Sequence, residues 1–420
     1  MEEKRTRSKN FFRKANLIID HYKKEYNQMP TDCFTSPGRI EILGNHTDHN
    51  NGLVMVSSID LSIMAVTSKN DSNYVCYASD EFPPIKVDIS DLSMKEEEKG
   101  NSIALIKGIL FRMKELGYQI GGVNIYAIST IFRGAGISSS AAFEVLITKI
   151  ISYYYNQDSI KKVELAKISQ YAESCYFGKP CGLLDQTGIA LGAINYIDFK
   201  NPEKPYIKRL MSPVKNYDLI LVNTLGSHSK LTPLFAKIRE DMSSLSSYFG
   251  KNVLREVGGR DFFGSEKQLK EKYSEDVFLR GKHYFDENNR VRKALKACED
   301  GDEQTFLKCI NESGLSSYYQ LKNCYVENEE ENLPRALLMT QEFLNGDGAS
   351  RLNGGGFAGT MSCFCPKERS EEYIKLMSEQ FGPSNVKKIV LTNHGTRYVC
   401  SVDSIVNDVE MQKEVKGVRK

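Results

Sequence analysis

The stretch RGAGISSSAA occupies residues 133–142, and helical spacing of apolar residues resumes directly after it. Glycines permit a tight loop whose backbone amides point inward together, and serines are favoured where a helix begins. The amino end of a helix with convergent amides can bind an anion, and a serine hydroxyl can ligate magnesium. A serine-capped helix after a glycine turn is the simpler interpretation. A Walker A loop is excluded, because the Gly-Lys-Ser/Thr ending is absent.

Three further clusters of glycine and polar residues lie on either side of this stretch. Residues 36–50 read SPGRIEILGNHTDHN, residues 179–186 read KPCGLLDQ, and residues 353–359 read NGGGFAG. Three successive glycines need unusual dihedrals or a close approach of the backbone to something, with a flexible surface loop as the alternative. His46 and Asp48 could bind hydroxyl groups, whereas the His46/His49 spacing is weak evidence for a metal site.

The length of the chain and the pattern of its elements predict a two-domain α+β protein. At about 100–200 residues per domain, 420 residues suggest two domains, and the turn-rich residues 201–205 place the boundary, giving domains 1–204 and 205–420. Strands and helices are mixed without strict alternation. We expect strands at residues 74–77, 85–89, 123–128, 193–198, 219–223, 360–365 and 396–401, and helices at 11–27, 103–116, 141–155, 160–176, 231–248, 278–299, 303–320 and 331–344.

Charge and composition exclude several functional classes. With 56 Lys and Arg against 54 Asp and Glu, the net charge is +2, so we expect neither a nucleic acid nor a membrane surface as partner. The chain has no apolar run long enough to span a bilayer. Ten cysteines without a CxxC pair favour neither a zinc ribbon nor a disulfide scaffold. The charged start carries no secretory signal. We therefore expect a reduced, cytoplasmic protein, and a monomer, since no dimer seam is visible.

Taken in order, the four clusters resemble the motifs of the galactokinase branch of the GHMP kinase superfamily (galactokinase, homoserine kinase, mevalonate kinase, phosphomevalonate kinase). Residues 37–50 are similar to the galactokinase signature, residues 134–142 to its phosphate loop, residues 180–186 to the segment with the catalytic aspartate, and residues 354–359 to the C-terminal glycine motif. The resemblance implies a two-domain GHMP-kinase fold with the active site in the interdomain cleft. It also implies transfer of the γ-phosphoryl group of ATP to the anomeric hydroxyl of a sugar, giving a sugar 1-phosphate.

The resemblance further implies a role for individual residues. Asp185 would be the base or would orient the sugar hydroxyl, with Arg39 beside it to keep it ionised and to neutralise the transferred phosphoryl group. The sugar would contact Asn45, His46, Asp48, Gly182 and Phe235. ATP would be bound by Gly134, Ala135, Gly136, Ser138, Ser139, Ser140, Gly355 and Gly356. The ligands of Mg²⁺ would be Ser140 and Glu173.

The sequence departs from the family pattern at two of the sugar positions. Asn45 stands where the family has Glu, and Phe235 stands where it has Tyr. A 6-carboxylate on the sugar would no longer be repelled by an acid at position 45. Glu41, on the same strand face as Arg39, could restore an acid nearby. We expect galactose as the substrate, and two alternatives stay open: a 1-kinase for a different sugar, such as galacturonate or an amino sugar, and a non-catalytic sugar sensor.

Overall fold

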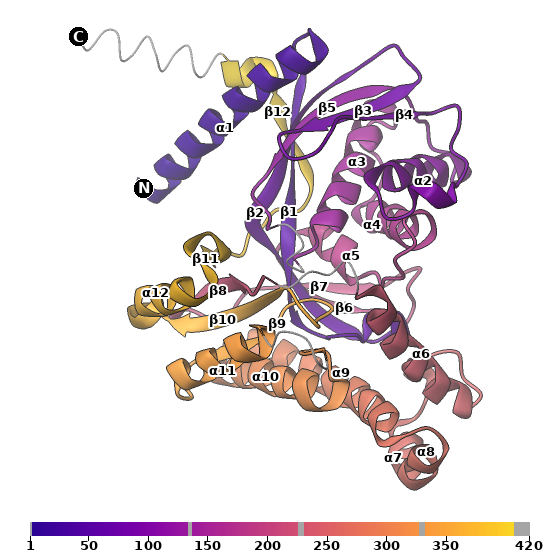
Figure 1. Ribbon diagram of the computed structural model, residues 1–420, viewed down its shortest axis with the longest axis vertical. Coiled ribbons are helices and arrows are strands. Elements are labelled where there is room, and N and C mark those ends of the chain that lie inside the picture. Colours follow the sequence, from indigo (N-terminus) through magenta and orange to yellow (C-terminus); the bar gives the residue numbers. More distant parts are fainter. Residues whose placement is uncertain (1, 133–136, 226–230, 327–331, 407–420) are drawn as a thin grey trace.

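Two β-sheets and the helices that cover them make up the fold seen in the computed structural model (Figure 1), which describes residues 2–132, 137–225, 231–326 and 332–406. One sheet has eight strands, in the order β12-β1-β2-β5-β3-β4, with β6 and β7 continuing from β2. The other has four strands, in the order β11-β8-β10-β9. Apart from β3, which runs parallel to β5, the strand pairs are antiparallel. The predicted α+β class is confirmed.

The eight-stranded sheet is covered by helices on both faces, and its long central strands are largely buried. Its strands are β1 (Asp32–Leu43), β2 (Leu53–Lys69), β3 (Tyr74–Ser79), β4 (Ile85–Asp88), β5 (Val123–Ser129), β6 (Ile194–Asp198), β7 (Tyr206–Leu210) and β12 (Arg397–Ser401). One face carries α1 (Glu2–Tyr26), and the other carries α2 (Ser102–Glu115), α3 (Ser139–Tyr155), α4 (Lys162–Tyr171) and α5 (Leu184–Leu191) (Figure 1). A π-helical turn, Ala172–Tyr176, extends α4.

The four-stranded sheet is built from the second half of the chain. It comprises β8 (Tyr217–Asn223), β9 (Ala349–Leu352), β10 (Thr360–Pro366) and β11 (Val386–Ile389). The helices of this half are α6 (Thr232–Tyr248), α7 (Gly259–Gly264), α8 (Glu266–Lys272), α9 (Glu275–Asp300), α10 (Glu303–Ser316), α11 (Asn332–Leu344) and α12 (Ser370–Phe381). A second π-helical turn, Ser317–Leu321, follows α10. Residues of α11 and α12 close one core against this sheet.

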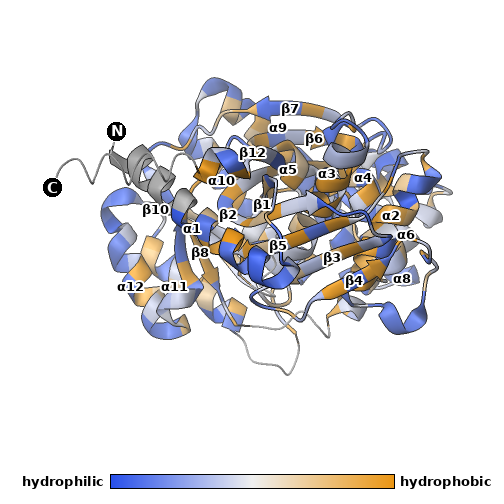
Figure 2. Cartoon of the chain, turned by 90° about the horizontal axis from the view of Figure 1, so that it is seen from above, coloured by the Kyte–Doolittle hydropathy of each residue, from blue (hydrophilic) through white to orange (hydrophobic). Residues whose placement is uncertain are grey.

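The main hydrophobic core runs from one sheet to the other. It joins Ile40 of β1 and Val145 of α3 to Leu219 of β8 and Val291 of α9. Figure 2 shows hydrophobic residues along the central strands and hydrophilic residues on the outward faces of the helices. Because burial of apolar area drives folding, this continuous core fixes the two sheets against each other.

The predicted boundary at residues 204 and 205 falls in the hairpin between β6 and β7. These two strands pair with each other in the eight-stranded sheet, with Ile194 opposite Leu210. Strand β12 returns to the same sheet and pairs with β1, with Cys33 opposite Cys400. The sheets therefore do not divide at this point of the sequence, and the division into 1–204 and 205–420 stays a prediction.

Candidate active site

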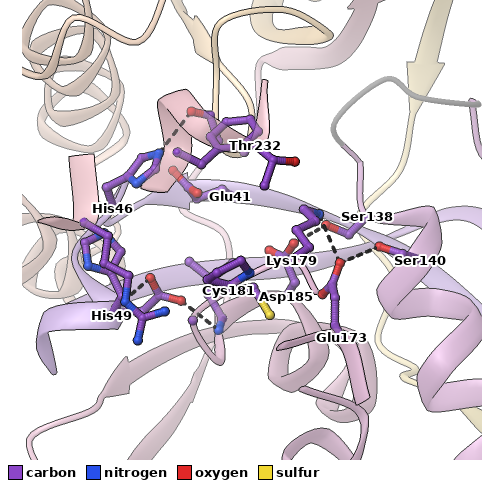
Figure 3. A pocket seen from close by; sticks show the side chains of 18 of the residues that line it. Glu41, His46, His49, Ser138, Ser140, Glu173, Lys179, Cys181, Asp185 and Thr232 are labelled. Atoms are coloured by element: carbon purple, nitrogen blue, oxygen red, sulfur yellow. Dashed lines mark hydrogen bonds and ion pairs between the residues drawn. The ribbon is translucent and has the colours of Figure 1, made fainter. Parts of the chain in front are cut away.

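One cavity of about 580 Å³ brings together residues of all four sequence clusters (Figure 3). Among the predicted site residues, those that line it are Arg39, Asn45, His46, Asp48, Ser138, Ser139, Ser140, Glu173, Gly182, Asp185, Phe235 and Gly355. Gly356 lies next to the cavity but does not line it. Gly134, Ala135 and Gly136 lie outside the described residues. The roles of these residues stay predictions, and their geometry follows.

Asp185, in the first turn of α5, is held by a fork of hydrogen bonds from Arg39 of β1. Nε of Arg39 donates to Oδ1 over 2.7 Å and Nη2 to Oδ2 over 2.9 Å, and Ser138 Oγ donates to Oδ2. Burial alone would raise the pKa of Asp185, but the charge and hydrogen bonds of Arg39 and the bond from Ser138 outweigh it and lower the pKa. Asp185 is thus an ionised acceptor for a hydroxyl proton.

The amino end of α3 lies next to Asp185. Its N-cap, Ser138, has left-handed backbone dihedrals, φ 57° and ψ 51°, and Ser139 and Ser140 begin the helix. Strand β5 leads towards this turn and β1 lies beside α3 in the packed core. A helix of 17 residues places its first free N–H groups here, and such groups attract phosphate.

Ser140 and Glu173 form the candidate magnesium site. Ser140 Oγ donates to Glu173 Oε1 over 3.0 Å, and the Lys179 ammonium group lies 3.0 Å from the same oxygen. Mg²⁺ prefers oxygen ligands and is commonly held by one or two protein groups together with substrate phosphates. Within the described ranges no three His, Cys, Asp or Glu side chains gather as a metal cage. The residues present therefore fit a metal shared with a nucleotide.

A second acid, Glu144 of α3, is buried behind Glu173. Gln186 Nε2 donates to Glu144 Oε2 over 3.0 Å and to Glu173 Oε2 over 2.7 Å. Burial and the neighbouring Glu173 raise the pKa of Glu144 well above its usual range. Burial therefore disfavours a charge on Glu144, and of the two side chains it is Glu173 that lines the cavity. Sequence reasoning missed Glu144, because an acid within an apolar helix carries no motif.

The turn after β1 is fixed by buried polar side chains of α9. Glu287 Oε1 accepts the backbone N–H of Gly44 over 2.8 Å, Asn288 Oδ1 accepts that of Leu53 over 2.7 Å, and His283 Nε2 bonds the carbonyl oxygen of Asn45 over 2.9 Å. Burial would raise the pKa of Glu287, but Arg290 and its other partners lower it to about 2. The first motif is therefore held in place by an ionised acid from another part of the chain.

Asn45 is completely buried and its amide group is fully engaged. Its Nδ2 donates to Glu41 Oε1 over 2.8 Å and to the carbonyl oxygen of Gly354 over 2.7 Å, and its Oδ1 accepts from Asn323 Nδ2 over 2.8 Å. Arg351 donates to the same Oε1 of Glu41 over 2.8 Å. Position 45 therefore lacks the negative charge that the family pattern has there, but the Glu41 carboxylate lies directly beside Asn45 and lines the cavity.

Asp48 and Gly182 are in close contact. Asp48 Oδ2 accepts the backbone N–H of Leu184 over 3.1 Å, and a Cβ added to Gly182 would lie 1.8 Å from that oxygen. Only glycine fits at position 182. Burial raises the pKa of Asp48, and the bond from Leu184 partly opposes this. The first motif and the aspartate segment are thereby joined at the cavity wall.

The third glycine cluster packs on the sugar motif through its carbonyl groups. His46 Nε2 bonds the carbonyl oxygen of Gly355 over 3.0 Å, and a Cβ on Gly355 would meet the Phe235 ring at 2.7 Å. The His46 and Phe235 rings stack with centroids 6.4 Å apart. Gly354 and Gly356 have φ of 77° and 90°, which explains why this loop needs glycine.

Among the cavity residues without an assigned role in the sequence are three with polar side chains, Lys179, Arg239 and Thr232. Arg239 and Thr232 come from α6, which also carries Phe235. A helical count of four from Phe235 could have placed Arg239 on the same face. Lys179 precedes Pro180 at the edge of a recognised motif, and only the three-dimensional contact with Glu173 distinguishes it.

Comparisons with known proteins agree with this geometry. The family described as GHMP kinases N terminal domain matches residues 104–193, and the galactokinase galactose-binding signature matches residues 20–69. Galactokinase of Limosilactobacillus fermentum is 27% identical, covering 86% of this chain and 92% of the relative. Galactokinase of Glaesserella parasuis is 29% identical, covering 87% and 93%.

Solved structures share the fold. Lactococcus lactis galactokinase complexed with galactose superimposes with a TM-score of 0.79 at 22% identity, covering 91% of this chain and 99% of that one. A mevalonate kinase gives a TM-score of 0.60 at 15% identity, covering 86% and 99%. The chain therefore carries matches to the GHMP kinase N-terminal domain and to the galactokinase galactose-binding signature, and it shares the fold of these kinases. Within the described ranges, none of the helices has both the length and the apolar character that a bilayer crossing requires.

Proposed function

We propose that this protein is a galactokinase, an ATP-dependent sugar kinase that converts galactose and ATP to galactose 1-phosphate and ADP. One observation carries the proposal: an ionised Asp185, held by Arg39 and Ser138, lies in one cavity with the sugar motif and the amino end of α3. The galactose-binding signature and the galactokinase relatives support galactose as the sugar.

In the proposed reaction, Asp185 accepts a hydrogen bond from the anomeric hydroxyl of the sugar. This hydrogen bond directs the hydroxyl oxygen at the γ-phosphorus of ATP. The new O–P bond forms as the bond to the β-phosphate oxygen breaks, ADP leaves, and the hydroxyl proton passes to Asp185 or to solvent. Such transfers depend on positioning and on cations more than on covalent help. Because Arg39 lowers the pKa of Asp185, the carboxylate is a good acceptor and a modest base.

ATP would lie with its phosphates at Ser138, Ser139 and Ser140 and beside Gly355, next to the proposed sugar contacts Asn45, His46, Asp48, Gly182 and Phe235. Ser140 and Glu173 would hold Mg²⁺, which supplies positive charge to the phosphates when bound. Phe235 and Gly355 form an apolar wall of the cavity. A sugar ring would pack against this wall, which offers no side-chain hydroxyl for a hydrogen bond.

The geometry of Glu41 and Asn45 argues against the alternative of a galacturonate kinase. The alternative of a different sugar is motivated by Asn45 and Phe235, but the Glu41 carboxylate lies 2.8 Å from Asn45 Nδ2 and lines the cavity. An acid there disfavours a 6-carboxylate. The described residues of the proposed catalytic machinery line one cavity, which a non-catalytic sensor does not need. Neither alternative has an observation in its favour.

We further propose a monomer in the cytoplasm whose partners are the sugar and ATP. The ten cysteines are free thiols, as a reducing compartment favours. The small net charge of +2 gives no electrostatic reason for a nucleic acid partner.

The test is a phosphorylation assay with galactose, glucose, galacturonate and N-acetylgalactosamine, comparing the unaltered enzyme with Asp185→Asn. We expect galactose to have the highest kcat/KM, and Asp185→Asn to lower kcat by about 100- to 10,000-fold. Asp198→Asn is the matched control, because it breaks an Asp–Arg pair of 2.8 Å outside the cavity, and it should leave turnover near that of the unaltered enzyme. A different preferred sugar, or full activity of Asp185→Asn, would contradict the proposal.

A further inference from the structure

Lys179 lies on the wall of the cavity, where no sequence motif assigns it a role. Its ammonium group is 3.0 Å from Glu173 Oε1. The Lys179 side chain is 39% exposed, whereas that of Glu173 is 2% exposed. Figure 3 shows Lys179 between Asp185 and the turn formed by Ser138 and Ser140. The cation is therefore accessible at the point where a transferred phosphoryl group would have to pass.

The ammonium group of Lys179 lies near three acids, Glu173, Asp185 and Glu144. Glu173 attracts the ammonium group most strongly and raises the pKa of Lys179, and Asp185 adds to this. Glu144 is buried behind Glu173 and shares the Gln186 amide with it. Because Asp185 is already paired with Arg39, Lys179 is the ion-pair partner that compensates Glu173 within the described part of the chain.

A purely structural ion pair would not need an exposed cation at this place. Glu173 is also the acid proposed to hold Mg²⁺ with Ser140. A divalent cation at Glu173 Oε1 and the ammonium group would compete for one oxygen, and the ammonium group would be repelled into the cavity. A lysine has a flexible stem and three N–H donors, so it can exchange a carboxylate for a phosphate oxygen without movement of the backbone.

We propose that Lys179 is a phosphate-binding residue of this kinase: its ammonium group neutralises Glu173 in the empty site and the γ-phosphoryl group when nucleotide and metal are bound. The inference rests on the proposed function, since it needs ATP in this cavity. Lys179 would be a third positive group at the site of phosphoryl transfer, in addition to Arg39 and the amino end of α3.

The experiment measures nucleotide affinity by calorimetry, with Mg²⁺, for ADP and for a non-hydrolysable ATP analogue. Lys179→Met should weaken binding of the analogue by roughly tenfold or more, while ADP, which lacks the γ-phosphate, binds as it does to the unaltered chain. Lys179→Arg should restore most of the loss. In turnover assays Lys179→Met should raise the KM for ATP and lower kcat without raising the KM for galactose.

The matched control is Lys167→Met, because Lys167 also forms ion pairs with acids but lies on α4 outside the cavity. It should change neither affinity. Equal loss of ADP and analogue affinity in Lys179→Met, or no loss, would overturn the proposal. If Lys179→Met does not fold because Glu173 is left unpaired, Lys179→Gln keeps an N–H donor for Glu173 without the positive charge, and it must still lose affinity for the analogue but not for ADP.

Failure of the proposed function would appear differently. A galactokinase assignment that is wrong would show as absent galactose turnover in the unaltered protein. The role of Lys179 would instead be judged by whether Lys179→Met loses affinity for the analogue while its affinity for ADP stays that of the unaltered chain.

Discussion

Glu41 and Asn45 form one hydrogen-bonded unit at the sugar end of the cavity. The family pattern has an amide at the first position and an acid at the second, and this chain has the two exchanged. Positions 41 and 45 meet because β1 ends at Leu43 and the turn brings Asn45 back towards Glu41. Burial raises the pKa of Glu41, and Arg351 opposes this. Two donors fix Oε1 of Glu41. A carboxylate is therefore kept at this end of the cavity, but it comes from position 41 instead of position 45.

The first prediction concerns Glu41→Gln. We expect kcat/KM for galactose to fall by about 10- to 100-fold, because a charged acceptor for a sugar hydroxyl is lost. The ratio of galacturonate to galactose turnover should rise, because the repulsive acid is gone. Steady-state assays with both sugars measure this ratio.

The exchange of both residues is the informative control. Glu41→Asn together with Asn45→Glu restores the family pattern and should recover more galactose activity than Glu41→Asn alone. If the ratio of the two sugars is the same in Glu41→Gln as in the unaltered enzyme, Glu41 does not face the sugar and the structural argument fails.

At this scale the sequence predicts the motif residues but not their neighbours. Arg39 and Asp185 could be paired in advance because each belongs to a recognisable cluster. Lys179 and Glu144 could not, because their roles depend on contacts across α3, α5 and the π-helical turn at Ala172–Tyr176. A lysine before a proline or an acid in a helix is usually structural or solvated.

Helix α9 shows how an element can be predicted while its function is not. Apolar periodicity indicates a helix at residues 278–299, and the structure has it at Glu275–Asp300. Its buried face, however, carries His283, Glu287 and Asn288, residue types that are usually placed at the surface. These side chains satisfy backbone groups of Gly44, Asn45 and Leu53, at the two ends of the turn between β1 and β2.

The second prediction follows from His283, which burial and neighbouring charges keep neutral. Burial lowers the pKa of His283 to about 4, whereas the unfolded chain has a value near 6.5. Between these values the unfolded state binds a proton that the folded state does not, so stability falls as pH falls from about 6.5 to 4. The loss is about 3 kcal/mol over this window. In His283→Gln the absolute stability drops, but this pH-dependent part should disappear.

Urea unfolding at pH 7 and at pH 4.5 measures the difference for both chains. His394 is the matched control, since its side chain is exposed and its pKa is lowered chiefly by Arg397. His394→Gln should keep most of the pH dependence. Equal pH dependence in His283→Gln and the unaltered chain would mean that His283 does not titrate in this window.

At the scale of the whole molecule, the fold class and the long helices could be predicted, whereas the long strand β2 and the four-residue strands β9 and β11 could not. Strands β9 and β11 have four residues each, too few for a periodic pattern to indicate a strand. They form because β8 and β10 present unpaired edges in a shared core. The return of β12 to β1 across the whole chain also has no local signal, since pairing partners are set by the packed core.

The third prediction is that the molecule unfolds as one unit and that β12 supports the strand bearing Arg39. Residues of both sheets share one core, so calorimetry should show a single transition rather than one for each predicted domain. Strand β12 pairs with residues 32–35 of β1, and the Tyr398 ring stacks on Tyr153 at 4.8 Å. Val402 and Ile405, just beyond it, are buried against α1.

A chain ending at residue 395 should therefore melt lower than one ending at residue 406. Burial of Val402 and Ile405 alone is worth about 3–6 kcal/mol, which corresponds to a fall in Tm of roughly 3–7 °C for a chain of this length that unfolds as one unit. Loss of support for β1 should also disturb the fork from Arg39 to Asp185 and lower kcat. Two separate transitions would contradict a single folding unit and would favour division of the chain into domains. Equal Tm for the two chains would show that β12 and the residues after it do not stabilise β1.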